Sequence, residues 1–299
     1  MSKNQTPSIR PVNMNVTNKS ATGSSRSMGE ILVDTGRLSP LDAERIAQFQ
    51  RQCGARFGEA GIALQLMTDD DVQFALSVQF EYPYLASDMS FHRELVAASK
   101  PDSRSVEQLR ALRSQLMLRW FENGADHKGL AIVSAGSQEG RSYIAANLAI
   151  LFSQLGERTL LIDADMRAPR QHQLFNLGRH AGLSDMLAGR VGPEAVVSIS
   201  ALPDLSVLPA GSIVPNPQEL LGRQRFSNLL LSLGEKFDVI IIDTPPASEC
   251  ADAQTIAVRA GAALIVARKD SSSVPQLNQF IHSLREFGVT LVGSVLNDV

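Results

Sequence analysis

Short apolar runs separated by amphipathic stretches dominate the second half of the chain. Five runs are mainly apolar and four to six residues long: 131–134, 159–162, 237–242, 262–267 and 291–296. Such runs are typical of strands buried on both faces of a sheet. Between the first two, four apolar residues fall on one helix face: Ile144, Leu148, Phe152 and Leu155. The alternation predicts an α/β fold with a doubly wound, mostly parallel sheet.

A further helix is predicted upstream of the first strand, after turn chemistry at residues 99–103. Its apolar face carries three leucines: Leu109, Leu112 and Leu116. The same helix also carries one acidic and two basic residues at a spacing of three: Glu107, Arg110 and Arg113. Taken alone, these charges indicate a solvated face with a weak ion pair.

The region before this helix contains an internal repeat with a period of 29 residues. Five pairs of positions carry identical or similar residues: Gly29 and Gly58, Glu30 and Glu59, Ser39 and Thr68, Asp42 and Asp71, Gln50 and Gln79. Each unit has a Ser or Thr three residues before an Asp, which is typical of a helix start. The repeat predicts two helix–turn–helix units that pack on each other.

Charge divides the 299-residue chain in the same places. Residues 1–27 carry four basic and no acidic residues, and their polar composition predicts a disordered arm. Residues 28–91 have a net charge of −6, and residues 92–299 have −1. We therefore expect the arm, a small helical domain at 28–91, a connector with an assembly helix at 92–127 and the α/β domain at 128–299.

Composition narrows the class of protein further. Hydrophobic residues make up 44% of the chain and charged residues 20%, as in a soluble globular protein. Neither a long apolar stretch nor a secretory leader is expected, and two cysteines are too few for a disulfide framework. The net charge of −3 argues against a general nucleic-acid binder. These features favour a reducing, cytoplasmic location.

A loop that contains glycine follows the strand predicted at 131–134. Eight residues form the loop and the start of the next helix: Gly136, Ser137, Gln138, Glu139, Gly140, Arg141, Ser142 and Tyr143. Strand, loop and helix start form the context of a phosphate-binding loop, because a helix N-terminus offers free N–H groups to an anion. Ala135 and Arg141 replace the Gly and Lys of G-x-x-x-x-G-K-[ST]. A serine-rich turn therefore remains the alternative for this loop alone.

Acidic residues follow two of the other predicted strands. Asp163, Asp165 and Arg167 alternate after 159–162, so we expect them on one side of a single strand end. Asp243 follows 237–242 in the same way. Buried carboxylates are costly unless they are paired, and Mg²⁺ with a phosphate chain would satisfy them. The predicted site therefore lies at the carboxyl ends of the strands, with the Ser142 hydroxyl as a further Mg²⁺ ligand.

Together these motifs resemble the bacterial tyrosine kinases, deviant-Walker ATPases related to the MinD/ParA group. The matching segments are S-A-x-x-x-E-G-[KR]-S, L-L-I-D-A-D-M-R-x-P, D-V-I-I-I-D-T-P-P, Leu208 to Gly211 and Pro215 to Leu221. The resemblance covers about 92–299 and is strongest to the EpsG-type chain-length-determinant tyrosine kinases. It implies a P-loop NTPase domain that uses ATP and Mg²⁺.

The resemblance also implies a role for each matching residue. Residues 136–142 would hold the ATP phosphates, and three side chains would bind Mg²⁺: Ser142, Asp163 and Asp243. Asp165 would be the base for the attacking hydroxyl, with Arg141 and Arg167 balancing phosphate charge. Asn297 would lie near the adenine, or be a strand-end turn residue, and Tyr143 would touch the nucleotide or pack. Glu107, Arg110 and Arg113 would join subunits into a ring.

The small helical domain resembles the N-terminal domain of type II secretion and pilus ATPases. Nine positions match: Gly29, Leu32, Gly36, Leu38, Gln50, Arg56, Gly58, Leu76 and Gln79. Some members of that family bind cyclic di-GMP, so the resemblance implies a docking role and a candidate ligand. Ser27, Gly61 and Gln65 depart from the pattern. A purely structural adaptor is the alternative.

The implied function is a cytoplasmic ATP-dependent protein-tyrosine kinase recruited to the inner face of the plasma membrane. Its partner would be a membrane chain-length determinant, a polysaccharide co-polymerase, in exopolysaccharide biosynthesis and export. Family kinases phosphorylate a tyrosine-rich tail, whereas this chain has only Tyr82, Tyr84 and Tyr143. Together with Arg141, this leaves a nucleotide-gated regulatory pseudo-kinase as the alternative. A MinD/ParA-type positioning ATPase is a third hypothesis.

Overall fold

The computed structural model describes residues 26–79, 92–124 and 128–298. The chain divides into two compact units, Met1–Gln79 and Phe80–Val299, and each is described by itself. Almost all of the arm predicted at 1–27 lies outside the described residues, as do Tyr82 and Tyr84.

Four helices form the first unit: α1 (Met28–Asp34), α2 (Pro40–Cys53), α3 (Phe57–Ala63) and α4 (Asp69–Gln79). They confirm the two predicted helix–turn–helix units. Ser27 caps α1 through a capping box with Glu30, and the Ser39 hydroxyl caps α2 by accepting the Asp42 N–H. The segment predicted as an arm therefore ends in a residue that belongs to the first helix.

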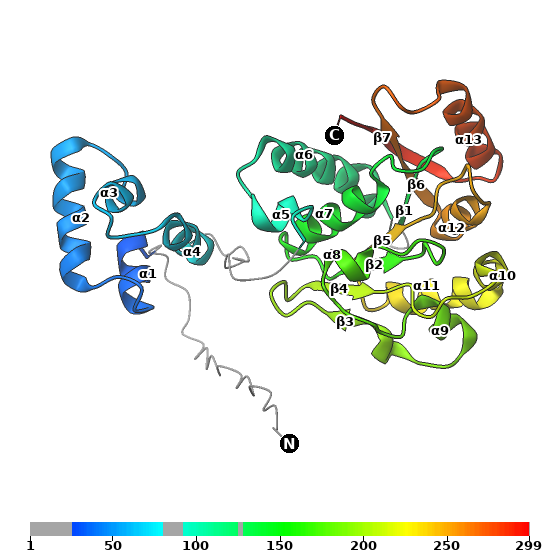
Figure 1. The fold of residues 1–299 in the computed structure, drawn as a ribbon, viewed down its shortest axis with the longest axis horizontal. Helices are drawn as coiled ribbons and strands as arrows, with labels where there is room; N and C mark the ends of the chain where they lie inside the picture. The colour runs from blue at the N-terminus through cyan, green and yellow to red at the C-terminus, as the bar shows by residue number, and fades with distance from the viewer. Residues whose placement is uncertain (1–25, 80–91, 125–127, 299) are drawn as a thin grey trace, which may run out of the picture. The chain divides into compact units, whose positions relative to one another are not determined.

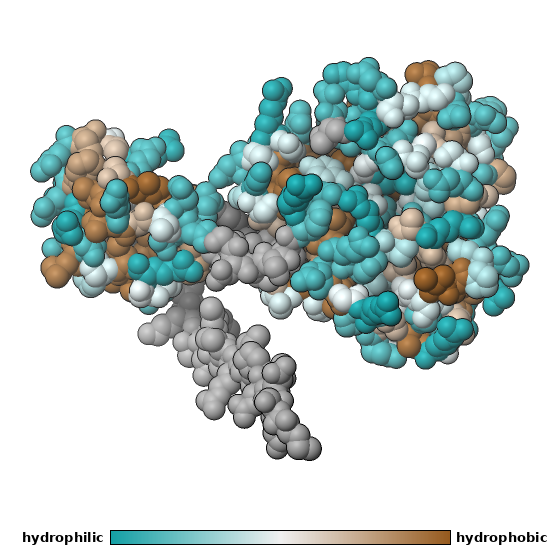
Figure 2. Space-filling view, viewed as in Figure 1, coloured by the Kyte–Doolittle hydropathy of each residue, from teal (hydrophilic) through white to brown (hydrophobic). Residues whose placement is uncertain are grey.

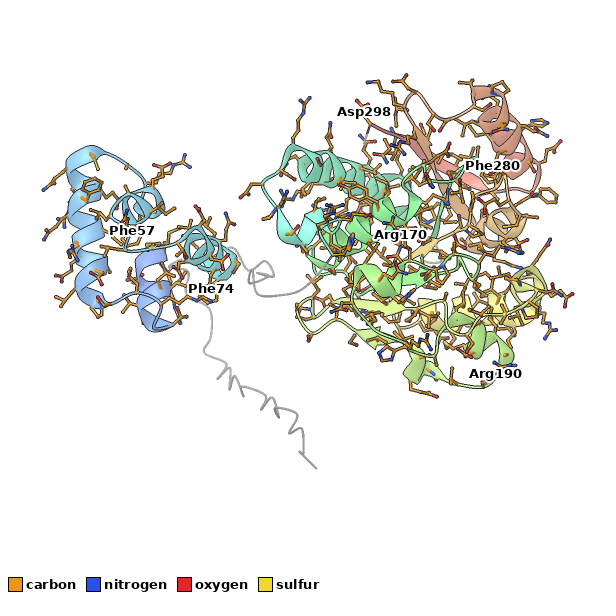
Figure 3. The ribbon with its side chains drawn as sticks, viewed as in Figure 1. Phe57, Phe74, Arg170, Arg190, Phe280 and Asp298 are labelled. Atoms are coloured by element: carbon orange, nitrogen blue, oxygen red, sulfur yellow. The ribbon has the colours of Figure 1, made fainter. Side chains whose placement is uncertain are left out.

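The two units of the repeat pack against each other through their repeated glycines. Helix α1 contacts α4, and α2 contacts α3. A Cβ on Gly29 would meet the Phe57 ring of the second repeat unit at 3.0 Å, and one on Gly58 would lie 3.6 Å from Met28 Sδ of the first repeat unit and 3.1 Å from Val72. Phe57 and Phe74 both lie in the small core of this unit (Figure 3). The 29-residue period therefore records two places where helices approach closely.

The second unit is built on a seven-stranded sheet of order β3-β4-β2-β5-β1-β6-β7 (Figure 1). Its strands are β1 (Gly129–Val133), β2 (Thr159–Asp163), β3 (Val197–Ser198), β4 (Leu205–Leu208), β5 (Val239–Asp243), β6 (Ala262–Arg268) and β7 (Thr290–Asn297). All neighbouring pairs are parallel except β3 with β4. The five predicted strands are present, and β3 and β4 were not predicted as strands.

Helices cover both faces of this sheet. The first face carries α5 (Val96–Ser99), α6 (Arg104–Arg119), α7 (Arg141–Ser153) and α8 (Gln171–Leu174). The second carries α9 (Leu183–Ala188), α10 (Pro217–Gly222), α11 (Gln224–Gly234), α12 (Asp252–Ala260) and α13 (Val274–Glu286). Two 3₁₀ turns complete the unit, η1 (Phe121–Asn123) and η2 (Pro193–Ala195). Figure 1 shows α5 to α7 on the side of the sheet opposite α11 to α13.

Alternating side chains of the strands enter the two cores. In β1, Leu130 and Ile132 face the first core, whereas Ala131 and Val133 face the second. The doubly wound sheet is therefore confirmed residue by residue.

Helix α7 differs from the amphipathic helix predicted there. Eleven of its thirteen residues are buried, because α5 and α6 cover the side that faces away from the sheet. Leu155, expected on its apolar face, lies beyond the helix end and is 50% exposed. A helix that is buried on all sides cannot show a polar stripe.

The visible surface of the second unit is mainly hydrophilic, with scattered hydrophobic side chains (Figure 2). In the described part of the chain, no helix has the length and apolar character needed to cross a bilayer.

Candidate functional site

Two aspartates end neighbouring strands at the carboxyl edge of the sheet. Asp163 is the last residue of β2 and Asp243 the last of β5, and they are register partners. Both side chains are fully buried. Parallel strands lie about 4.8 Å apart, so the fold places two carboxylates side by side away from water.

Gln171, the first residue of α8, joins both aspartates to the helix start at Ser142. Its backbone N–H and that of Arg170 each donate to Asp163 Oδ2 at 2.9 Å. Its Nε2 donates to Asp243 Oδ2 at 2.7 Å and to the Ser142 carbonyl oxygen at 3.2 Å. Three residues predicted to share a site are therefore connected through one that sequence reasoning missed. The only signal was a glutamine three residues before the apolar pair Leu174 and Phe175.

The donor set fits Mg²⁺. Asp163 Oδ1 and Asp243 Oδ1 are buried and have no hydrogen-bond partner. The Ser142 hydroxyl also forms a hydrogen bond with Asp243. Among the described residues, no three His, Cys, Asp or Glu side chains gather as a metal site. Mg²⁺ commonly takes one or two carboxylates and completes its shell with phosphate and water, which matches two aspartates and a serine.

Burial raises the pKa of both aspartates. The pKa of Asp243 rises to about 6 because of its burial, although hydrogen bonds from Gln171 and Ser142 oppose the rise. The pKa of Asp163 lies well above its ordinary value because of burial and the neighbouring Asp243. Ionising two neighbouring buried carboxyl groups is electrostatically unfavourable, and a bound divalent cation would offset that cost.

We expect these aspartates to make the metal-free protein less stable as pH rises. The folded pKa of Asp243 lies above its ordinary 3.8, so the native state binds this proton more tightly than the unfolded chain does. The resulting stability is complete below about pH 4 and is lost as pH rises through about 6, an effect of about 3 kcal/mol. Urea unfolding in chelator at several pH values, for wild type and Asp243→Asn, measures it. If the free energy of unfolding of wild type minus that of the variant stays constant or rises with pH, the prediction is wrong.

The phosphate loop connects β1 to α7 and has two residues with positive φ, Gln138 at 57° and Gly140 at 98°. Ser137 and Gln138 are exposed at its tip. Glu139 is 2% exposed: its carboxylate accepts the Gly136 N–H at 3.1 Å and a short hydrogen bond from the hydroxyl of Ser272. The loop is therefore held in shape by one contact within it and one from the segment after β6.

Asn297, the last residue of β7, braces the loop from the other side. Its Nδ2 donates to the Glu139 carbonyl oxygen at 3.2 Å. A Cβ on Gly140 would lie 2.2 Å from that nitrogen, so the loop can approach Asn297 only with glycine at this position.

Arg141, which replaces the lysine of the common phosphate-loop pattern, is 8% exposed. Its Nη1 donates to the Gly136 carbonyl oxygen at 2.8 Å and, through a short contact, to the Ser134 hydroxyl. Its Nε donates to the Thr244 carbonyl oxygen at 2.8 Å, directly after Asp243. The arginine therefore fits the loop and also ties it to the end of β5.

The expectation that Asp163, Asp165 and Arg167 share one strand end is wrong. Strand β2 ends at Asp163, and Asp165 Oδ1 accepts the N–H groups of Arg167 and Ala168 in the following turn. The Arg167 guanidinium pairs with the buried Asp252 at the start of α12, with Nε 2.9 Å from Oδ2. A turn, not strand alternation, sets the directions of these two side chains.

A cavity of about 720 Å³ adjoins the loop on the side of α6 and β7, and Tyr143 and Asn297 are among its lining residues. Tyr143 lies in the first turn of α7 and is half-buried, and its pKa is raised by burial and by Glu94. The structure thus brings Tyr143 and Asn297 to one hollow beside the loop.

Helix α6 packs on α7 through its predicted leucine face; Leu109 and Leu116 are buried and Leu112 is partly buried. Glu107 and Arg110 form a close ion pair. Arg113 is half-buried and donates to the Leu151 carbonyl oxygen of α7 at 2.9 Å. The sequence predicts one solvated face for the three charges, but Arg113 points into its own domain.

Comparison with known proteins decides the family. Residues 131–294 match the family described as an AAA domain. The putative tyrosine-protein kinase CapB of Staphylococcus aureus is 34% identical over 203 residues, which are 68% of this chain and 88% of CapB. The chain belongs to the bacterial tyrosine-kinase family. Tyrosine-protein kinase ptk of Acinetobacter johnsonii, 34% identical over 69% of this chain, matches over only 28% of its own length, so the chain spans less than a third of that tyrosine kinase.

Several solved structures share the fold. The chimerical protein CapA2B2 superimposes with a TM-score of 0.65 at 33% identity, over 76% of this chain and 99% of that one. The kinase domain of Escherichia coli ETK gives 0.65 at 30% identity, over 69% and 80%. MinD of Pyrococcus horikoshii, with a TM-score of 0.50 at 22% identity, shares the fold alone. The predicted P-loop NTPase fold is confirmed.

Proposed function

We propose that this chain is a protein-tyrosine kinase that binds ATP with Mg²⁺ and transfers the terminal phosphoryl group to tyrosine. One observation carries the proposal: hydrogen bonds of Gln171 join Ser142, Asp163 and Asp243 at the foot of the phosphate loop. The tyrosine-kinase relatives support the choice of reaction.

The residues of this site have separate roles in binding the phosphates and the metal. The N–H groups of the loop and of the thirteen-residue helix α7 bind the phosphate chain, with the positive end of the helix dipole behind them. Ser142, Asp163 and Asp243 hold Mg²⁺, which shields the phosphate charge when it is bound. Arg141 adds a guanidinium at the same loop, where it pairs with phosphate oxygens.

The acceptor side of the reaction is assigned to Asp165 and Arg167. Asp165 takes the proton of the tyrosine hydroxyl. The tyrosine oxygen forms the new bond to the terminal phosphorus, the bond from that phosphorus to the ADP oxygen breaks, and ADP leaves. A second cavity of about 450 Å³ lies beside Arg167, Glu219 and Thr255 and has room for part of the acceptor. Asp252 keeps the Arg167 guanidinium at this edge, where it balances phosphate charge.

The nucleoside is assigned to the 720 Å³ cavity beside the loop. Asn297 presents an amide there, and Tyr143 offers an aromatic ring to a base. Incubating the full chain with γ-labelled ATP and Mg²⁺ tests the reaction. Label on tyrosine supports the kinase. If the incubation yields no phosphotyrosine and no released phosphate, the kinase is excluded.

A regulatory pseudo-kinase is the second candidate, because Arg141 uses two of its nitrogens on three acceptors of its own chain. The kinase proposal predicts that Arg141→Met lowers ATP affinity at least about tenfold, since it removes a phosphate-pairing charge and leaves buried acceptors unpaired. It also predicts that Arg141→Lys keeps activity. ATP titrations and labelled-phosphate assays on both variants measure this. An inactive wild type beside an active Arg141→Lys protein favours the pseudo-kinase instead.

The cellular setting is proposed from the family alone. We assign the chain to the cytoplasm at the inner face of the plasma membrane, with a membrane chain-length determinant as partner in exopolysaccharide production. Self-association is assigned to α6 through Glu107 and Arg110, with Arg113 supporting the helix from within. Cyclic di-GMP is the ligand proposed for the first unit.

A further inference from the structure

Unpaired buried oxygens gather around Gln171. In the described part of the chain, four buried side-chain nitrogen or oxygen atoms lack a hydrogen-bond partner. One is Arg113 Nε, and the other three are oxygens: Asp163 Oδ1, Asp243 Oδ1 and Gln171 Oε1. These three residues are also joined to one another by hydrogen bonds. The unsatisfied acceptors are therefore concentrated at one place.

Such a concentration is costly without a ligand. An unpaired buried acceptor is destabilising, and folded proteins leave few of them. Gln171 is fully buried, so solvent does not relieve its Oε1. Three buried acceptor oxygens without a partner at one place indicate a site completed by a cation and the water molecules bound to it.

The hydrogen bonds of Gln171 divide each carboxylate into a held oxygen and a free one. Its N–H fixes Asp163 Oδ2, and its Nε2 fixes Asp243 Oδ2 at 2.7 Å. In both aspartates the oxygen without a partner is Oδ1. The carboxylates are therefore oriented before any metal binds. Residues that form hydrogen bonds to metal ligands commonly orient them in this way.

Gln171 is itself held in place by its neighbours. Its Nε2 also donates to the Ser142 carbonyl oxygen, which links it to the start of α7. The adjacent Arg170, labelled in Figure 3, forms an ion pair with Glu94 at 2.7 Å and donates its N–H to Asp163. The amide therefore lies on a fixed backbone.

We propose that Gln171 is a positioning residue of the Mg²⁺ site. Its N–H and Nε2 orient Asp163 and Asp243, and its Oε1 accepts a hydrogen bond from a water molecule bound to the metal. The inference rests on the proposed function, since it requires that the chain binds Mg²⁺ with a nucleotide.

The test uses Mn²⁺ as a paramagnetic probe of the metal site, with the full chain and ADP. Gln171→Leu removes the amide at similar volume, and Gln171→Asn keeps an amide that is too short to reach Asp243. Gln173→Leu is the matched control, because Gln173 is exposed on the same short helix. Electron paramagnetic resonance measures free Mn²⁺, and a separate titration gives ADP affinity in chelator.

Both Gln171 variants are expected to weaken Mn²⁺ binding about 10- to 100-fold. ADP affinity without metal is expected to stay within about twofold, because a general loss of structure would lower both affinities. The control is expected to behave like wild type in both titrations. Wild-type Mn²⁺ affinity in the two Gln171 variants, or an equal loss of ADP and metal binding, overturns the inference and leaves the proposed function intact. A wild type that binds neither Mn²⁺–ADP nor Mg²⁺–ADP overturns both.

Discussion

An Asp243→Asn protein is expected to lose Mg²⁺-dependent nucleotide binding and, with it, phosphoryl transfer. Asp243 lies between Gln171 and the Ser142 hydroxyl, and its free oxygen is one of two carboxylate oxygens that can contact the metal. Residues that only support metal ligands cost 10- to 100-fold when replaced, so loss of a ligand should lower Mg²⁺–ATP affinity by at least about 100-fold. Calorimetric titration of Mg²⁺–ATP measures the change.

The same substitution should leave the fold intact. Asparagine has nearly the shape of aspartate and removes a buried charge, so the variant should unfold at a denaturant concentration no lower than wild type in chelator. Asp238→Asn is the control: this residue lies just before the same strand, at its other end, and pairs with Arg158 at the surface. Equal losses of Mg²⁺–ATP affinity in both variants would contradict the assigned role of Asp243.

A Gly140→Ala protein is expected to lose at least about tenfold in ATP affinity, with a loss of stability of about 1–3 kcal/mol. Gly140 has a φ of 98°, and an added Cβ would lie 2.2 Å from Asn297 Nδ2. That contact would displace the amide which holds the Glu139 carbonyl oxygen. The loop that binds the phosphates would lose both its conformation and its brace. ATP titration and thermal unfolding report the two effects.

A Gly156→Ala protein is the control that separates the strain of a positive φ from the contact with Asn297. Gly156 follows α7 with a φ of 90°, but nothing lies within 4 Å of a Cβ added there. It should lose stability through backbone strain and keep its ATP affinity, because it lies at the other end of the helix from the loop. If Gly140→Ala binds ATP no more weakly than Gly156→Ala does, Asn297 does not brace the loop.

The positions of the two buried aspartates could be predicted because each follows an apolar strand directly. The chain order then places Asp163 and Asp243 at the same edge of a parallel sheet. The loop and its helix could be predicted for the same reason, since strand, loop and helix are contiguous in sequence. Local order along the chain was sufficient for five of the seven strands, for the loop and for the repeat of the first unit.

Contacts between residues far apart in sequence could not be predicted. Arg167 pairs with Asp252 and Arg141 with the Thr244 carbonyl oxygen, and no local pattern marks either pair. Gln171 was missed because a single polar side chain has no periodicity, although its amide joins Asp243 to the Ser142 carbonyl oxygen. Strand β3 was missed because it is only two residues long, and β4 was missed because Ser206 interrupts its apolar residues.

The central claim is that one pocket binds a nucleotide together with Mg²⁺. Calorimetric titration of the wild-type chain with a non-hydrolysable ATP analogue, with and without Mg²⁺, tests it most directly. Asp163 and Asp243 predict one saturable site whose nucleotide affinity rises at least about tenfold when Mg²⁺ is present, because the two buried carboxylates each have an oxygen free to bind the cation. No binding at millimolar analogue, or an affinity that Mg²⁺ leaves unchanged, would contradict it.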